Sequence, residues 1–252
     1  RGNASAELFA AAGYSGWSLS YNDFRQFGQG AEDGGAERLA QYLAHVRGLD
    51  PSLPPPVCTN INLTGTALEP HVPTHSIISL PGGQRLALLS AFTGTNLRAV
   101  NPVLGSRVAF NMKRALQVEV ARLHTLAGGL PEVVVVVVDA MHAVSDADIL
   151  AYSSKTAAKE ALIQEMVDEL LGVDIIIDNT DVGGGHAYQV RQNWAGERVL
   201  LISGGDVQYG TGITSASLSF DSDGKLQQAS STEQIANCSV AEEPTSAAAL
   251  TS

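Results

Sequence analysis

The stretch Val133-Val134-Val135-Val136-Val137-Val138, followed by Asp139, decides the fold of this chain. A strand with one solvated face alternates apolar and polar residues. These six valines do not alternate, so both faces of their strand are expected to be buried. Val173 to Ile177 is interpreted in the same way. The valine run is the longest apolar run in the chain, and it is far shorter than the roughly 20 residues that span a bilayer.

Helical and strand patterns alternate around the valine run. We expect helices over 34–48, 108–126 and 146–171, strands over 14–19, 57–61, 198–202 and 213–220, and a hairpin that joins 75–80 to 85–91. In the second of these helices, Ala115, Val118 and Leu123 are expected to face the core. The order predicts a layered α/β fold in which helices cover mixed sheets.

The composition describes an acidic globular protein. The chain has 252 residues, of which 44% are hydrophobic and 16% charged, and its net charge is −11. Such apolar content excludes a disordered chain. The negative charge repels phosphate backbones, so a nucleic-acid partner is not expected. Two cysteines exclude a disulfide-dense mini-protein and a multi-cysteine zinc module.

Residues 1–229 are expected to form one domain. Residues 230–252 are rich in Ser, Thr, Ala and Glu and are expected to be a flexible linker or tail. The chain begins at Arg1-Gly2-Asn3 without an initiator Met or a signal-like segment, which favours a processed or trimmed polypeptide.

Sequons and cysteines bear on the compartment. N-x-[S/T] sequons occur at Asn3, Asn62 and Asn237 and favour a glycoprotein that is secreted or at the cell surface. Two alternatives remain for Cys58 and Cys238. They are unrelated thiols, or they form a disulfide that ties the tail to the domain.

Polar side chains follow several of the expected strands. Oxygen and imidazole ligands that converge from strand ends suit a hard or borderline metal ion. The candidate metal ligands are Asn22, Asp139, His142, Asp178 and His186. Each has an ordinary alternative role, as a turn residue, a helix cap or a histidine in a glycine-rich loop. No G-x-S-x-G elbow is present, which argues against a serine hydrolase.

Six segments follow one another in an order that resembles the metallophosphoesterase (calcineurin-like) domain of the 5′-nucleotidase family. Pro56-Val57-Cys58-Thr59-Asn60-Ile61 is similar to that family's P-V-L-S-A-N strand, and the other segments are 11–19, 77–93, 173–177, 203–210 and 218–225. The resemblance implies an α/β/β/α sandwich of mixed sheets flanked by helices. It also implies two divalent metals, Mn or Zn, that activate water to attack a phosphate ester.

The chain departs from this family at the residues that carry the chemistry. Where the family has G-N-H-E-F-D, Tyr21 stands at the metal-binding Asn and Asn22 at the catalytic His. An amide cannot donate a proton as an imidazolium does. The next ligand His aligns with Met141, or with His142 after a slip of one residue. The G-G-H-S-H positions fall on 178–182, and His186 replaces them only after a further shift. The family's first metal motifs would lie upstream of Arg1.

Two functions follow from the resemblance and its departures. The first is a non-catalytic domain without a metal cofactor, secreted or at the cell surface, with a structural or protein-binding role in a larger assembly. Trp17, Trp194 and Tyr209 are the candidate anchors for a protein partner. The second is a metal-dependent phosphoric-ester or nucleotide hydrolase with a rearranged or incomplete metal site.

Overall fold

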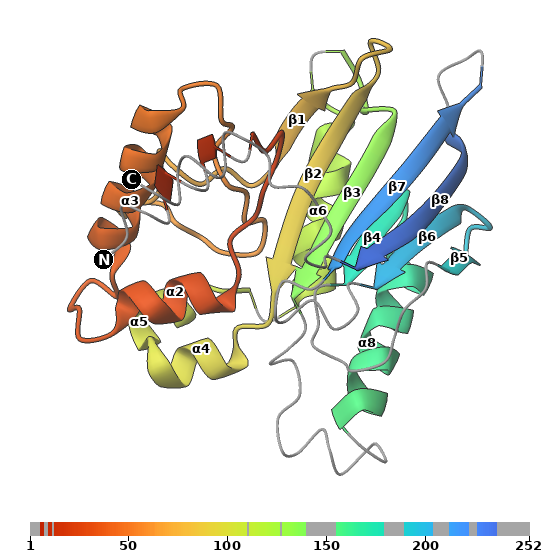
Figure 1. Ribbon diagram of the computed structural model, residues 1–252. Helices are drawn as coiled ribbons and strands as arrows, with labels where there is room; N and C mark the ends of the chain where they lie inside the picture. Colours follow the sequence, from red (N-terminus) through yellow and green to blue (C-terminus); the bar gives the residue numbers. More distant parts are fainter. Residues whose placement is uncertain are drawn as a thin grey trace.

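The structure is a computed structural model of the whole chain (Figure 1). It describes residues 6–7, 10–11, 13–109, 111–126, 128–139, 155–178, 189–203, 212–221 and 226–235.

A six-stranded sheet forms the centre of the molecule, with strand order β1-β2-β3-β4-β6-β5. Its strands are β1 (Ser76–Ser79), β2 (Arg85–Phe92), β3 (Val133–Asp139), β4 (Ile175–Asp178), β5 (Gln189–Gln192) and β6 (Arg198–Ser203). The four inner strands β2, β3, β4 and β6 run parallel, and both outer strands pair antiparallel to their neighbours. The expected valine strand is therefore β3, and it lies inside the sheet.

Both faces of β3 are buried, as the valine run predicts. Val134, Val136 and Val138 pack in one core cluster with residues of α6 (Met112–Leu123) and α8 (Lys155–Glu169). Val133 and Val135 pack in a second cluster on the opposite face. In Figure 1, α6 lies behind the sheet, while a separate two-stranded sheet of β7 (Gly212–Phe220) and β8 (Leu226–Ile235) lies in front.

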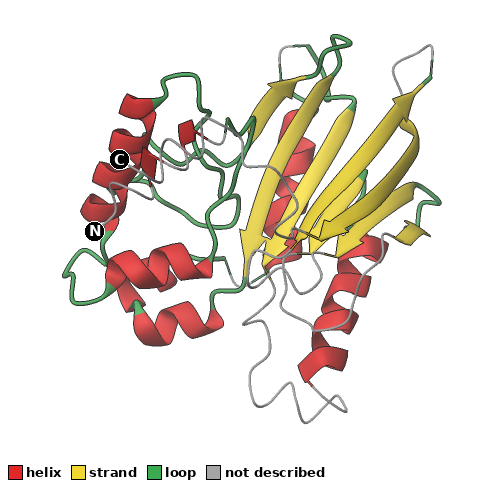
Figure 2. Ribbon diagram, viewed as in Figure 1, coloured by secondary structure: helices red, strands yellow, loops and turns green. Residues whose placement is uncertain are grey.

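The remaining described helices gather beside β1 and β2 (Figure 2). They are α2 (Tyr21–Gly28), α3 (Ala36–Leu49), α4 (Thr95–Val100) and α5 (Pro102–Gly105), and they share a third core cluster that includes Phe92 of β2. The buried Asn101 side chain joins these helices, because its amide donates to the carbonyls of Phe24 and Gly34 and its carbonyl oxygen accepts from the amide of Leu104. The expected mixed α/β class is confirmed. No helix covers β7 and β8 within the described ranges.

Two expected strands are replaced by single bridges. Ser18 pairs only with Val57, and Ile61 only with Val108, so 14–19 and 57–61 are not strands. Past the pair of Ser76 and Leu88, where β1 leaves the edge of β2 unpaired, side chains bond that edge instead. The Thr59 hydroxyl accepts from the Ser90 amide, and the Asn60 carboxamide bonds both N and O of Phe92. The Thr59 backbone amide also donates to the Ser90 carbonyl at 2.7 Å. One backbone bond and these side chains thus satisfy the edge without a regular ladder.

Two further expectations are wrong in detail. On α6, Leu123 faces the core as expected, but Val118 is 60% exposed, and the core side of the helix also carries Leu116 and Val120. The strand β8 continues to Ile235 and pairs with β7, so the ordered fold extends past residue 229 into the expected tail. Residues 236–252 lie outside the described residues. Among the described helices, none is long and apolar enough to cross a membrane.

Candidate functional site

The carboxyl ends of the parallel strands meet at one edge of the six-stranded sheet, where sites form in folds of this kind. The register pairs Phe92 with Asp139, Val138 with Asp178, and Asp178 with Ser203. Asp139 and Asp178 are each about 7% exposed. Two of the candidate ligands therefore lie at the ends of neighbouring strands, as the sequence predicts, and both are buried.

The same register places these two carboxylates on opposite faces of the sheet. Paired residues share a face, and successive residues of a strand alternate. Asp178 shares the face of Val138, which packs against α6 and α8. Asp139 shares the face of Phe92, which packs in the cluster of α2 to α5. This register therefore does not favour a single metal ion held between the two carboxylates.

The helix α2 supplies a third carboxylate to this edge. Ser20 caps the helix, and its backbone amide and hydroxyl both donate to Oδ2 of Asp23, at 2.8 and 3.2 Å. The rings of Phe24 and Phe92 stack at 5.3 Å and fix the helix against the end of β2. Burial raises the pKa of Asp23, and the negative charge of Asp139 adds to the rise, while the bonds from Ser20 oppose it. Asp23 thus lies within electrostatic range of Asp139.

One enclosed hydroxyl lies at the same edge. Thr93 follows β2, and its backbone amide donates to the carbonyl of Asp139 at 3.3 Å. Its Oγ1 is enclosed and has no hydrogen-bond partner in the described part of the chain. Neither Asp23 nor Thr93 stood among the candidate ligands. The signal for Asp23 was its position three residues after Ser20, which is the spacing of a capping box.

Tyr21 occupies the position at which the resemblance puts a metal-binding Asn. Its side chain is 5% exposed and packs in the core cluster with Leu19 and Phe24. The Arg25 guanidinium lies 5.8 Å from the centre of its ring. A tyrosine held inside the core offers no carboxamide oxygen to a metal, so the described residues do not fit the metal pair that the resemblance implies.

The other candidate ligands are placed only in part. Asn22 lies half-buried in the first turn of α2. His142 and His186 lie outside the described residues. Within the ranges that the structure describes, no three His, Cys, Asp or Glu side chains lie close enough to hold one metal ion.

A polar cluster that sequence reasoning missed lies between β1 and α6. The Glu119 carboxylate is 8% exposed and accepts from the Thr74 hydroxyl, at 2.8 Å, and from Arg122. Nδ1 of His75 lies 2.6 Å from the same carboxylate. Burial alone would raise the pKa of Glu119, but these hydrogen bonds outweigh it and lower the pKa to about 2. No spacing in the sequence joins residues 74–75 to residue 119.

The cysteines and the glycosylation sequons also lie only partly within the described residues. Cys58 is a free thiol enclosed in the core, and burial raises its pKa further from the range in which a thiolate forms. The other cysteine, Cys238, lies outside the described residues, so the disulfide stays one of the two alternatives. Asn62 is exposed. Asn3 and Asn237 also lie outside the described residues, so glycosylation stays a prediction at all three sequons.

The candidate anchors differ in exposure. Trp194 is 78% exposed, which keeps it available to a partner. Trp17 is only partly exposed and packs against two core clusters. Tyr209 lies outside the described residues.

The strand order and the helix layer define a mixed α/β protein with the 5′-nucleotidase-like, metallophosphoesterase type of fold. A 5′-nucleotidase precursor from Thermus thermophilus matches 93% of this chain with 41% of its own, at 19% identity and a TM-score of 0.66. An NAD nucleotidase from Haemophilus influenzae matches 99% of this chain with 48% of its own, at 15% identity and a TM-score of 0.61.

A third solved structure extends the comparison. A putative 5′-nucleotidase from Staphylococcus aureus, in complex with alpha-ketoglutarate, matches 97% of this chain with 42% of its own, at 13% identity and a TM-score of 0.54. The chain thus spans less than half the length of each of these proteins. At such identities the likeness establishes the fold. No protein-family model matches the sequence, and no curated protein matches it significantly.

Proposed function

We propose that this chain is a non-catalytic 5′-nucleotidase-like domain with a structural or protein-binding role. The observation that carries the proposal is Tyr21, whose buried ring stands where the resemblance puts a metal ligand. Asn22 stands at the catalytic His position, and its neutral amide cannot donate a proton as an imidazolium does.

The other groups at the strand ends support the same proposal. The carboxylate of Asp23 caps its own helix through two bonds from Ser20. Asp139 and Asp178 stand on opposite faces of the sheet. These carboxylates have structural surroundings that a metal pair would have to rearrange.

Metal analysis and an activity assay test the proposal together. The full chain is incubated with excess Mn²⁺ or Zn²⁺, desalted and assayed for bound metal and for hydrolysis of an aryl phosphate. We expect hydrolysis at the background rate with either ion. Stoichiometric metal, with turnover that His142→Ala abolishes and His124→Ala preserves, would overturn the proposal. His124 is the matched control because it is an exposed histidine at the end of α6.

A second candidate function is a metal-dependent hydrolase of phosphate esters, with a rearranged metal set. One observation favours it: Asp23 and Asp139 lie within electrostatic range, and Thr93, whose backbone amide bonds the Asp139 carbonyl, has an enclosed hydroxyl without a partner among the described residues. Two divalent metals would be required to offset these charges for an anionic substrate. Under this alternative, Asp139→Asn removes turnover and metal binding in the same assay.

The proposed location is extracellular or at the cell surface. The exposed side chain of Asn62, within Asn62-Leu63-Thr64, supports it. Expression through a secretory pathway should add a glycan that Thr64→Ala removes without loss of secretion. A chain secreted with Asn62 unmodified would contradict the use of this sequon.

A further inference from the structure

Three exposed apolar side chains form a row across the layer of α6 and α8, near the edge at which the parallel strands begin. Val118 of α6 is 60% exposed, Leu171 after α8 is 44% exposed, and Trp194 between β5 and β6 is 78% exposed. The Gln117 carboxamide joins α6 to the backbone of Leu171 through two hydrogen bonds. The Trp194 amide donates to the carbonyl of Asp168 on α8, and α8 contacts β5. Leu171 therefore lies between the other two members of this apolar row.

The turn that carries Trp194 is held in one shape by Asn193. The Asn193 side chain is 5% exposed, and its carbonyl oxygen accepts from the amides of Ala195 and Glu197, at 3.0 and 2.9 Å. Its amide group donates to the carbonyl of Leu170 at 3.3 Å. The fold thus presents the indole of Trp194 to solvent on a fixed loop. A rigid, exposed tryptophan is typical of the residues that dominate the energy of protein interfaces.

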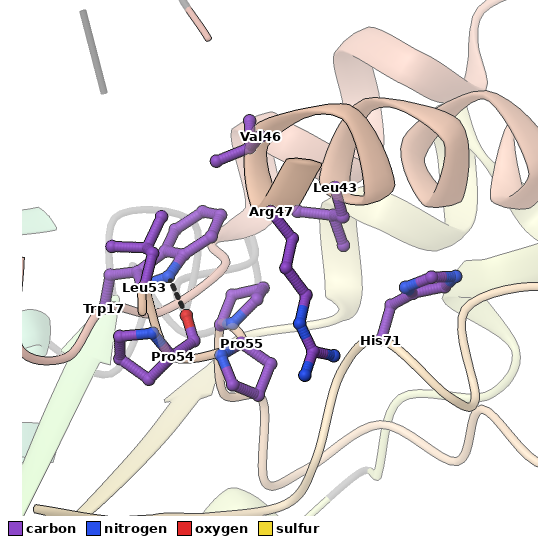
Figure 3. A pocket seen from close by; sticks show the side chains of 9 residues that line it. Trp17, Leu43, Val46, Arg47, Leu53, Pro54, Pro55 and His71 are labelled. Atoms are coloured by element: carbon purple, nitrogen blue, oxygen red, sulfur yellow. Dashed lines mark hydrogen bonds between the residues drawn. The ribbon is translucent and has the colours of Figure 1, made fainter. Parts of the chain in front are cut away.

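The other tryptophan does not offer such a surface. The indole N–H of Trp17 donates to the carbonyl of Pro54 at 2.7 Å, and the ring packs against the cluster of Leu53 (Figure 3). The recess that Trp17 lines has a cavity volume of about 10 Å³, which is room for about one water. Trp194 is therefore the tryptophan that the fold leaves open to a partner.

The two sides of the apolar row differ in charge. α6 contains three basic residues and one acidic residue, and α8 contains two basic and four acidic residues, so their net charges are +2 and −2. On α6, the exposed Arg114 lies one turn before Val118 and forms no ion pair among the described residues. On the other side, Asp168 and the exposed Glu197 form none within the same ranges. The hairpin also has two arginines that already have partners within the chain, Arg191 and Arg198.

We propose that the apolar row binds a second copy of this chain about a twofold axis that passes near Leu171. Such an axis turns the row end for end, so Val118 of one copy meets Trp194 of the other. The same rotation brings the basic side of each copy to the acidic side of the other. A surface with this pattern is complementary to itself, which is why we assign a second copy as its partner. The dimer rests on the protein-binding role proposed above and gives that role a partner.

The size of the helix layer sets the expected affinity. Helices of 12 and 15 residues are about 20 Å long, and neighbouring helices pack about 10 Å apart. The face that they present is smaller than the about 800 Å² that each partner of a stable complex buries. We therefore expect a reversible dimer with a dissociation constant of about 10 to 100 μM, and a monomer at about 1 μM.

Analytical ultracentrifugation of the full chain tests the dimer. Trp194→Ala and Leu171→Ala should each weaken it at least about tenfold, because the twofold axis makes every lost contact count twice. Leu49→Ala is the matched control, since Leu49 on α3 is also 44% exposed, and should leave the dimer unchanged. A chain that stays monomeric at about 300 μM would overturn the proposal. A dimer that tolerates both variants would overturn the choice of surface.

Cross-linking tests the position of the axis. A residue near a twofold axis lies close to its own copy, so Leu171→Cys should form a disulfide between two chains under mild oxidation. Leu49→Cys should not, and it measures what the native cysteines contribute, because both variants retain them. Equal cross-linking of the two variants would overturn the twofold arrangement.

Charge reversal tests the complementarity. Arg114→Glu makes both sides of the apolar row acidic and should weaken the dimer at least about tenfold. Arg47→Glu makes the same change of charge at an exposed site on α3 and should have no effect. Equal effects of the two variants would overturn the charge pairing. Metal content and hydrolysis are measured separately, so a monomer with background hydrolysis would overturn the dimer and leave the non-catalytic assignment in place.

Discussion

At the residue scale, the Glu119 carboxylate is held ionised by hydrogen bonds from His75, Arg122 and Thr74, which outweigh its burial. Its pKa is lowered to about 2 from 4.5, so it stabilises the fold above pH 4.5, and this contribution is lost as the pH falls toward 2. Glu119→Gln should reduce the free energy of unfolding by about 2 to 4 kcal/mol at pH 7. Urea denaturation measures the change.

The matched control for this residue is Glu165→Gln. Glu165 pairs with Lys113 at the surface, and its side chain is 50% exposed. Surface pairs contribute at most about 1 kcal/mol. Equal losses of unfolding free energy in both variants would show that the contacts of Glu119 with Thr74, His75 and Arg122 stabilise the fold no more than a surface ion pair does.

The ionised carboxylate of Asp174, unlike that of Glu119, lowers the stability of the fold. Burial raises its pKa to about 6, the charge of Glu197 adds to the rise, and a bond from the Val134 amide opposes it. The folded chain therefore holds a proton that the unfolded chain releases near pH 4, and this group lowers stability as the pH rises from 4 to 6. Asp174→Asn keeps an acceptor for Val134 and should stabilise the fold by about 1 to 3 kcal/mol at pH 7.

Unfolding at several pH values checks the sign for Asp174. The gain in Asp174→Asn over the parent chain should be near zero at pH 3.5, grow between pH 4 and 6, and stay constant above. A gain that is independent of pH would mean that charge is not its cause.

Sequence reasoning located residues that end strands but not residues that meet across the fold. Asp139 and Asp178 follow apolar runs, and their position at strand ends was predictable, whereas their burial was not. The proximity of Asp23 to Asp139 depends on the packing of α2 against β2, through Phe24 and Phe92. Such packing depends on contacts about 70 residues apart, for which one sequence has no local signal.

At the scale of elements, the edge of β2 shows how side chains replace a strand. The Asn60 carboxamide donates to the carbonyl of Phe92 at 2.7 Å and accepts from its amide at 3.2 Å. Asn60→Ala leaves two buried backbone groups without partners and should destabilise the fold by about 2 to 5 kcal/mol. Asn62→Ala is the control, because Asn62 is exposed, and should cost less than about 1 kcal/mol. Thermal unfolding of both variants decides, and similar losses would contradict this role for Asn60.

The elements that sequence predicted well are those with a strong local pattern. The valines of β3, the hairpin of β1 and β2, and the helix α3 have periods or turn residues that fix their type. The residues 57–61 are buried like a strand, yet the polar Thr59 and Asn60 bond β2 through their side chains. On α6, both Val118 and Val120 fit an apolar stripe, and only packing against the sheet selects Val120.

At the scale of the whole molecule, β2 connects the main core clusters. Leu89 belongs to the cluster under α6 and α8, Leu88 to the cluster on the opposite face, and Phe92 to the cluster of α2 to α5. Because β2 contributes residues to all three clusters, displacing β2 from one cluster would expose residues of the other two. We therefore expect the described clusters to unfold in one cooperative transition.

The two tryptophans test this expectation from opposite ends of the sheet. Trp17 packs against the α2 to α5 cluster, and the backbone of Trp194 bonds to Asp168 of α8. The variants Trp17→Phe and Trp194→Phe each leave one probe. Leu89→Ala should lower stability by about 2 to 5 kcal/mol and shift both probes to the same new midpoint, because Leu89 is fully buried in the shared strand. Val118→Ala, at a position 60% exposed, should leave both midpoints unchanged. Separate midpoints for the two probes would mean that β2 does not couple the clusters.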